Sequence, residues 1–276
     1  MKQQIQKQIE RIVKEANFSL RKDILTLLNK AYISETNKKA RHALELILEN
    51  AKIAKREGLA ICQDTGLPII FIEIGKNKSV SGSVVEEIEN AVISSYKNNY
   101  LRASTVAPFD RDNPSYKGVI SHLEFSPHIK GVKVTIFPKG FGSENKSRLK
   151  MFNPTVDFKK IEDFILESIE IAGPESCPPF VLGVGIGGTS DTALLLAKKA
   201  LIGRVDNKNK DKFLDKLEKQ LLNKINSLNI GPMGLGGKHT CLAVKIKTDS
   251  THIAGLPVGV NISCHALRSA SCYLNI

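Results

Sequence analysis

The chain has 276 residues, 42% of them hydrophobic, which is enough for a substantial buried core in one large domain or two small ones. Its formal net charge is +12, but a nucleic-acid groove combines basic residues with aromatic ones, and the chain has no Trp and only 5 Tyr. Solvated helix faces therefore explain the charge better, although an anionic substrate or an acidic partner also fits. No apolar run is long enough to span a membrane, so we expect no membrane partner. The scarcity of aromatic residues likewise argues against a nucleic-acid partner.

Residues 1–58 have the apolar periodicity of amphipathic helices, and the last of these helices is expected to stop at Gly58, which suits a C-cap. The first helix has a core-facing pattern rather than that of a secretion signal. The five cysteines are odd in number and widely spaced, which argues against a disulfide framework. We therefore expect a reducing, cytoplasmic location.

Beyond residue 58, short apolar runs alternate with longer amphipathic ones. Strands are expected at 68–75, 121–126, 132–138, 178–188, 241–248 and 256–263, and helices at 83–101, 158–173, 190–201 and 212–228. Ser83 and Glu86 have capping-box spacing at the start of one helix. The stretches 138–147 and 231–240 are polar and rich in glycine, which predicts loops. The expected fold is mixed α/β: one domain over 1–276, with a helical part at 1–58 and a mixed sheet with flanking helices at 59–276.

Gly183, Gly185 and Gly188 follow a predicted strand and open a helix, as in dinucleotide-binding proteins. That pattern also requires an acidic residue at the end of a second strand, whereas Asp206 lies in a charged loop after a helix. A dinucleotide oxidoreductase is therefore a weak hypothesis, and close packing of strand and helix explains the glycines better. An anion bound by the N–H groups near Thr189 is a third interpretation.

Each cysteine taken alone is best explained as a small buried hydrophobic residue, and Cys241 and Cys272 fit that description. Cys62, Cys177 and Cys264 differ because each stands at a loop or element end, in "CQDTG", "ESCPP" and "NISCH". Three thiolates from distant loops suit an iron–sulfur cluster that lacks a fourth protein ligand. The spacing by itself does not establish such a cluster, because no pair of cysteines forms a CxxC motif.

Four stretches occur in order along the chain: "CQDTG", "ESCPPFVLGVGIGGTSDTALLLAKKAL", "GPMGLGGKHTCLAVKI" and "HIAGLPVGVNISC". Together they resemble the α component of the iron–sulfur hydro-lyases, which are the class I fumarate hydratases and the tartrate dehydratases. The resemblance runs from the N-terminal helices to Cys264. It implies reversible hydration of fumarate to (S)-malate, with the α subunit of L-tartrate dehydratase as the alternative.

The resemblance also implies a [4Fe-4S] cluster held by Cys62, Cys177 and Cys264, with its fourth iron open to substrate as a Lewis acid. Asp64 is similar to the family residue that handles the proton of the departing or arriving water. Gln63 matches a substrate contact beside the cluster. A turn aspartate bound to the backbone of Thr65 or Gly66 is the ordinary structural role for Asp64, and the two roles are compatible.

Arg102 matches a family arginine that grips a substrate carboxylate, a task that suits the planar guanidinium. His252 matches a histidine that enters the active site, either of its own chain or of a neighbouring protomer. Gly140 and Gly142 match a loop whose backbone approaches the substrate. The family usually has three consecutive glycines there, whereas this chain has Phe141 between Gly140 and Gly142.

Single-chain members of the family continue into a further domain that completes the site, whereas this chain ends shortly after Cys264. The resemblance therefore implies an α subunit that needs a separate β subunit, with an α–α contact in a heterotetramer. The substrate would be a small dicarboxylate. A hypothesis from another class is a non-catalytic protein that binds anions or nucleic acid, motivated by the positive charge.

Overall fold

The computed structural model describes residues 2–274, which divide into two compact units. The described residues of the first unit are 2–21, 51–141 and 268–274, and those of the second are 22–50 and 142–267. The chain therefore leaves the first unit and re-enters it twice. The expected boundary at residue 58 does not coincide with this division, and the single domain over 1–276 stays a prediction.

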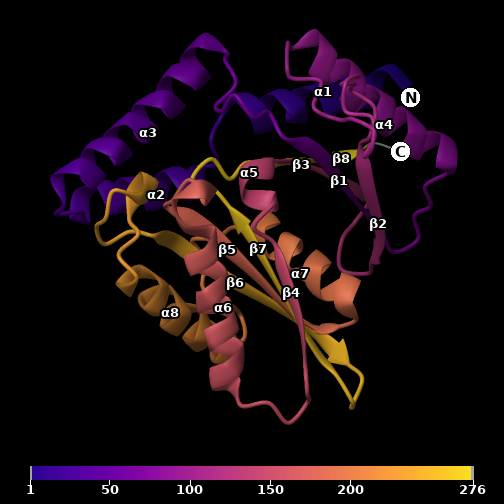
Figure 1. Cartoon of the computed structure of the whole chain (residues 1–276). Coiled ribbons are helices and arrows are strands. Elements are labelled where there is room, and N and C mark those ends of the chain that lie inside the picture. Colours follow the sequence, from indigo (N-terminus) through magenta and orange to yellow (C-terminus); the bar gives the residue numbers. More distant parts are fainter. Residues whose placement is uncertain (1, 275–276) are drawn as a thin grey trace. The chain divides into compact units, whose positions relative to one another are not determined.

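The first unit is built on a mixed four-stranded sheet in the order β2–β1–β3–β8 (Figure 1). Its elements are α1 (Lys2–Phe18), β1 (Leu67–Gly75), α4 (Gly82–Asn98), β2 (Ile120–Ser126), β3 (Val132–Lys139) and β8 (Ala270–Leu274). β1 pairs in parallel with β2 and antiparallel with β3, which pairs antiparallel with β8. The last strand, β8, therefore pairs with a strand from the middle of the sequence.

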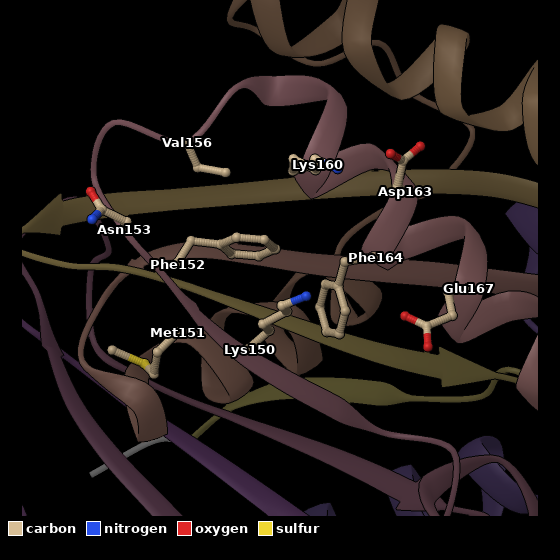
Figure 2. A pocket seen from close by; sticks show the side chains of 9 residues that line it. All are labelled: Lys150, Met151, Phe152, Asn153, Val156, Lys160, Asp163, Phe164 and Glu167. Atoms are coloured by element: carbon tan, nitrogen blue, oxygen red, sulfur yellow. The ribbon is translucent and has the colours of Figure 1, made fainter.

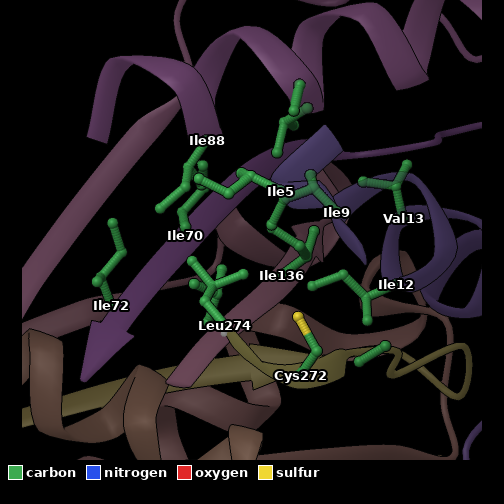
Figure 3. Close-up of a cluster of buried hydrophobic side chains, with 14 of the residues drawn as sticks. Ile5, Ile9, Ile12, Val13, Ile70, Ile72, Ile88, Ile136, Cys272 and Leu274 are labelled. Atoms are coloured by element: carbon green, nitrogen blue, oxygen red, sulfur yellow. The ribbon is translucent and has the colours of Figure 1, made fainter. Parts of the chain in front are cut away.

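One face of this sheet is sealed by the apolar stripes of α1 and α4 (Figure 3). Ile9 and Ile88 from the helices and Ile70 and Ile136 from the strands are all fully buried in this cluster. Alternate residues of a strand point to the same face, which explains why the β1 residues in this cluster, Ile70, Ile72 and Ile74, recur at every second position. This core fixes the positions of β1 and β3. Residues of the candidate site lie just before the start of β1 and just after the end of β3.

The second unit contains the other sheet, in the order β4–β7–β5–β6, with β5 and β6 parallel and the other pairs antiparallel. Its strands are β4 (Arg148–Phe152), β5 (Phe180–Gly188), β6 (Cys241–Thr251) and β7 (Leu256–Ser263). Its helices are α2 (Lys22–Ser34), α6 (Phe158–Ala172), α7 (Ser190–Ile202) and α8 (Lys212–Ser227), with short 3₁₀ turns η1 (Gly173–Ser176) and η2 (Pro232–Gly234). Helix α3 (Lys38–Glu57) begins in this unit and ends in the first, and α5 (Phe141–Glu144) lies at the boundary.

The sheet of the second unit has helices on both faces. Leu182 and Val184 of β5 belong to a core with α6 and α8, whereas Gly183 and Gly185 face α7. A Cβ atom on Gly183 would lie 2.1 Å from the carbonyl oxygen of Ala197, and one on Gly185 would lie 2.0 Å from that of Ala193. These glycines therefore allow close packing of strand and helix, which confirms that interpretation of the motif.

The mixed α/β class and the helical N-terminal part are confirmed, and Gly58 follows α3 with a φ of +65° as expected of a C-cap. Other local expectations were wrong. Helix α4 begins at Gly82 with Ser81 as its N-cap, so Ser83 lies inside the helix and is not the cap. The expected loop 138–147 contains the end of β3 and the single turn α5.

Two short strands were not expected from the sequence, β4 and β8. Cys272 lies in β8 rather than in a tail, and it is 6% exposed in the core of the first unit. Both strands lie at sheet edges and have only 5 residues each, so the apolar alternation is short. Across residues 2–274, no helix combines the length and hydropathy needed to cross a membrane.

Candidate functional site

The segment Cys62–Gly66 joins α3 to β1 and turns sharply around the carboxylate of Asp64. Asp64 Oδ1 accepts a hydrogen bond from the backbone N–H of Gly66 at 2.9 Å, which confirms the turn-aspartate role. Gly66 has a φ of +75°, and a Cβ there would lie 2.8 Å from the carbonyl carbon of Pro138. Only glycine satisfies both the left-handed backbone and the close approach of β3.

The second oxygen of Asp64 is bound by the loop that follows β3. Asp64 Oδ2 accepts a hydrogen bond from the backbone N–H of Phe141 at 2.8 Å, and a Cβ on Gly140 would lie 3.4 Å from the same oxygen. The N–H group of Phe141 therefore faces Asp64. Each carboxylate oxygen has one donor, and a carboxylate can accept further bonds at its other lone pairs.

Side chains from distant positions anchor the main chain of this segment. The Tyr96 hydroxyl donates to the carbonyl oxygen of Thr65 at 3.2 Å, and the Arg268 guanidinium donates to that of Asp64. Arg268 is 3% exposed, and its Nε has no hydrogen-bond partner among residues 2–274. The sequence analysis missed both residues, because Tyr96 lies within an ordinary helical pattern and Arg268 follows the cysteine motif in a run of small residues.

Gln63 and Arg102 lie beside Asp64 with exposed side chains. The backbone N–H of Arg102 donates to Thr65 Oγ1 at 3.0 Å, and its Nη1 lies 3.4 Å from the carbonyl oxygen of Gln63. Cys62 Sγ lies 3.4 Å from Gln63 Oε1. The first unit thus brings together Gln63, Asp64, Arg102 and Gly140, and the half-buried thiol of Cys62 lies next to the Gln63 side chain.

In the second unit, Cys177 ends the turn η1 in a left-handed conformation, with φ 52° and ψ 65°. Its N–H donates to the carbonyl oxygen of Pro174 at 3.0 Å, and the carbonyl of Pro178 accepts from Met233 N at 2.8 Å. The glycine-rich loop 231–237 therefore supports the cysteine from the side of η2. A Cβ on Gly234 would lie 2.6 Å from Pro174 Cβ, so a side chain is excluded there.

Cys264 directly follows β7, and the next residue connects it to Cys177. The carbonyl oxygen of Cys177 lies 3.3 Å from the backbone nitrogen of His265 and 3.0 Å from its Nδ1. These contacts bring the two cysteine loops together across 88 positions of sequence. The sequence analysis did not select His265, whose only signal is its place next to Cys264.

The five cysteines fall into two chemical groups. Cys241 and Cys272 are buried, and burial raises the pKa of both thiols, to about 12 for Cys241. A thiol that keeps its proton is a poor metal ligand, so the prediction that these two are buried hydrophobic residues is confirmed. Cys62, Cys177 and Cys264 are half-buried at the ends of elements, and thiols of this kind fit the donor set of an iron–sulfur cluster.

Cys62 lies in the first unit, and Cys177 and Cys264 lie in the second. Within residues 2–274, no group of three or more His, Cys, Asp or Glu side chains is placed as a metal site. Within the second unit, the contacts between His265 and the carbonyl oxygen of Cys177 hold the loops of Cys177 and Cys264 together.

The remaining predicted residues lie in the second unit. His252 is exposed in the turn between β6 and β7, where its Nδ1 accepts from the N–H of Ala254 at 3.1 Å. Ile253 beside it is 89% exposed. Gly142 is exposed within α5, whereas Ser143 is buried.

The structure does not support the alternative interpretations of the glycine motif. Asp206 lies in a loop, where Arg204 Nε and Nη2 donate to its carboxylate at 3.0 and 2.6 Å, so it is not the acidic residue at a strand end that a dinucleotide site needs. At the start of α7, Asp191 already occupies the N-terminal turn. The Thr189 hydroxyl donates to this carboxylate at 2.5 Å and lowers its pKa, which places a negative charge where an anion would bind.

A cavity of about 600 Å³ lies between β4 and α6 (Figure 2). Phe152 and Phe164 form its apolar wall, and Lys150 Nζ lies 5.1 and 5.8 Å from their ring centroids. None of the predicted site residues lines this cavity. The chemistry-bearing residues of the chain lie instead at the ends of β1, β3, η1 and β7.

A family model described as fumarate hydratase (fumerase) matches residues 6–273 of the chain. A putative L(+)-tartrate dehydratase subunit alpha of Methanocaldococcus jannaschii is 43% identical over 266 residues, which cover 94% of this chain and 93% of that protein. The L(+)-tartrate dehydratase subunit alpha of Escherichia coli K12 is 26% identical over 251 residues, covering 89% and 82%. With a match over nearly its whole length, the chain belongs to the fumarate hydratase family of hydro-lyases and is similar to the alpha subunits of tartrate dehydratases.

Proposed function

We propose that the chain is the α subunit of an iron–sulfur hydro-lyase that adds water to, or removes it from, a small dicarboxylate. The observation that carries the proposal is the convergence around Asp64. Gln63, Arg102 and Gly140 come from separate parts of the sequence, and the first unit places them within contact of that carboxylate or its flanking peptide groups. A carboxylate beside an exposed guanidinium is suited to proton transfer on an anionic substrate.

Asp64 handles the proton in this proposal. Its two oxygens are held by the N–H groups of Gly66 and Phe141, and each keeps a lone pair for the proton. Such fixation orients a general acid or base before the substrate arrives. Arg102 binds a substrate carboxylate with its exposed fork, and Gln63 orients the substrate hydroxyl. His252 acts from an exposed turn and can therefore serve the site of a neighbouring protomer.

Cys62, Cys177 and Cys264 would hold a [4Fe-4S] cluster, and their half-buried thiols support this assignment. When bound, the cluster supplies a Lewis acid that makes hydroxide a better leaving group. The remaining chemistry belongs to the chain. Gly140 has no side chain, so the loop after β3 can approach Asp64 closely. The backbone N–H of Phe141 holds the carboxylate in place.

We propose the interconversion of (S)-malate and fumarate as the first candidate reaction, because the matching family model is described as fumarate hydratase. The second candidate is dehydration of L(+)-tartrate, which is favoured by the printed names of the two relatives. Both substrates are four-carbon dicarboxylates with a hydroxyl on the carbon next to a carboxylate. They differ in that tartrate has a second hydroxyl. Both suit a site in which Asp64 transfers a proton, Arg102 binds a carboxylate and a bound iron would act as Lewis acid.

We further propose that a separate β subunit completes the site, since both named relatives are alpha subunits. An α–α contact would let His252 of one chain serve another, giving a heterotetramer. Three thiols kept reduced for a cluster would suit a reducing compartment such as the cytoplasm.

The test is anaerobic co-expression of the chain with a candidate β subunit, followed by parallel assays with malate, fumarate and tartrate. The proposal expects turnover of one of these substrates by the complex and little turnover by the α chain alone. The ratio of kcat/KM between malate and tartrate decides between the two reactions. Full activity of the α chain alone, or turnover that persists after iron is removed, would contradict the proposal.

A further inference from the structure

We propose that His265 is a positioning residue that joins the loops of Cys177 and Cys264 into one preformed pair of cluster ligands. The inference rests on the proposed function. It concerns a histidine that is adjacent in sequence to one cysteine and bound to the main chain of the other. It assigns the histidine no contact with substrate and no metal ligation.

The carbonyl oxygen of Cys177 has two contacts with the same residue. The backbone nitrogen of His265 lies 3.3 Å from this oxygen, and the Nδ1 of its ring lies 3.0 Å away. A carbonyl oxygen only accepts hydrogen bonds, so this geometry requires the proton of the ring to be on Nδ1. The two contacts together fix both the position of the Cys264 main chain and the orientation of the imidazole.

Cys177 needs such support because its own backbone is unfavourable. A non-glycine residue at φ 52° and ψ 65° lies in the left-handed region, where its Cβ is crowded by the following carbonyl oxygen. Pro174 accepts the N–H of Cys177 on one side, and Met233 binds the carbonyl of Pro178 on the other. His265 binds the carbonyl oxygen of Cys177, which lies between these two restraints in the sequence. The N–H of Cys177 and the carbonyl groups of Cys177 and Pro178 are therefore all held by hydrogen bonds.

The arrangement resembles the outer partners of metal ligands in general, which orient donors without touching the metal. Removing such a partner typically lowers metal affinity by about 10- to 100-fold. His265 lies between two ligands in space, so the loss of its side chain is expected to affect Cys177 and Cys264 together. Cys62 lies in the other unit and serves as an internal reference.

The experiment uses the full chain, reconstituted anaerobically with ferrous iron and sulfide. Iron per chain is measured, and the rate of iron loss to an excess of chelator is followed. We expect His265→Leu to lose iron about 10- to 100-fold faster than the wild type. His265→Asn keeps an N–H donor at the place of Nδ1 and should restore slow loss, whereas His265→Gln moves the donor outwards and should not. His42→Leu, at an exposed histidine, is the matched control.

A second readout needs no iron. In the metal-free chain, alkylation of Cys177 and Cys264 should become faster in His265→Leu, while that of Cys62 stays unchanged. If the wild type takes up iron and all four variants lose it at the wild-type rate, the inference is overturned and the proposed function stands. If the wild type takes up no iron, the proposed function fails. If His265→Leu does not fold, the contrast between the Asn and Gln variants decides, and equal rates for these two overturn the inference.

Discussion

The segment Cys62–Gly66 and the loops of Cys177 and Cys264 are held in place by different means. The first is fixed by side chains from distant positions: Tyr96 and Arg268 bind its carbonyl groups. The second is fixed by backbone bonds and one imidazole. Asp64 and the exposed side chains gather in the first region, whereas the second region presents two thiols.

The difference indicates a division of labour within the α chain. Under the proposed function, the first region holds the groups that bind the substrate and transfer the proton, together with one thiol, and the second region holds the other two thiols. Substitutions of Gln63 or Asp64 should therefore change turnover and leave iron binding intact, whereas loss of the Cys62 thiol should lower iron binding. Changes in the loops of Cys177 and Cys264 should lower iron binding first.

Asp64→Asn should produce the largest change. The amide keeps the shape of the side chain and one acceptor oxygen, but it no longer transfers a proton, so kcat of the αβ complex should fall by about 100- to 10,000-fold. Iron content should stay at the wild-type level. Loss of iron together with activity would break the proposed separation between the two regions.

Alkylation of the metal-free chain sharpens the contrast among the cysteines. Burial raises the pKa of Cys241 from 9.0 to about 12, so at pH 8 its thiolate fraction should be about 1,000-fold lower than that of an ordinary thiol. Mass spectrometry should find the label on Cys62, Cys177 and Cys264 well before Cys241 or Cys272. Early labelling of Cys241 would show that its β-strand opens readily.

Arg102→Gln should raise KM by about 10- to 100-fold, because a hydrogen bond to a charged group contributes roughly 1.5–3 kcal/mol. Steady-state kinetics of the αβ complex measure the effect, and Arg111→Gln, at an exposed position of the same unit, is the control. A fall in kcat at unchanged KM would instead assign Arg102 to the transition state.

Tyr96→Phe tests the anchoring of the first region and should have the smallest effect. Loss of the bond to Thr65 should lower the free energy of unfolding by about 1 kcal/mol, measured with urea at pH 8. Burial raises the pKa of Tyr96 from 10.0 to about 12, so the folded state favours the neutral phenol. The resulting stabilisation is complete below pH 10 and is lost as the pH rises through 12. The variant should lack this part of the alkaline destabilisation, and an unchanged pH profile would contradict the assignment.

The sequence predicts what depends on local pattern. The helices and the central strands follow from apolar periodicity, and the packing role of Gly183 and Gly185 follows from their place between a strand and a helix. The short edge strand β8 was missed because its alternation covers few residues and its pairing partner, β3, lies far away in the sequence.

The same limit applies to the candidate site. Cys62, Cys177 and Cys264 could be selected because each lies beside residues that break regular structure. Arg268 and His265 could not, because their roles come from contacts across 204 and 88 positions that no local pattern encodes. Phe141 departs from the usual glycine, yet its contribution is a backbone N–H, which any residue except proline supplies.

The iron and sulfide content of the anaerobically reconstituted chain tests the central claim most directly. The account predicts about four iron and four sulfide per chain, with loss of both in Cys62→Ser, Cys177→Ser and Cys264→Ser and full retention in Cys241→Ser and Cys272→Ser. A wild-type chain without iron, or iron that survives removal of the first three thiols but not of the last two, would contradict it.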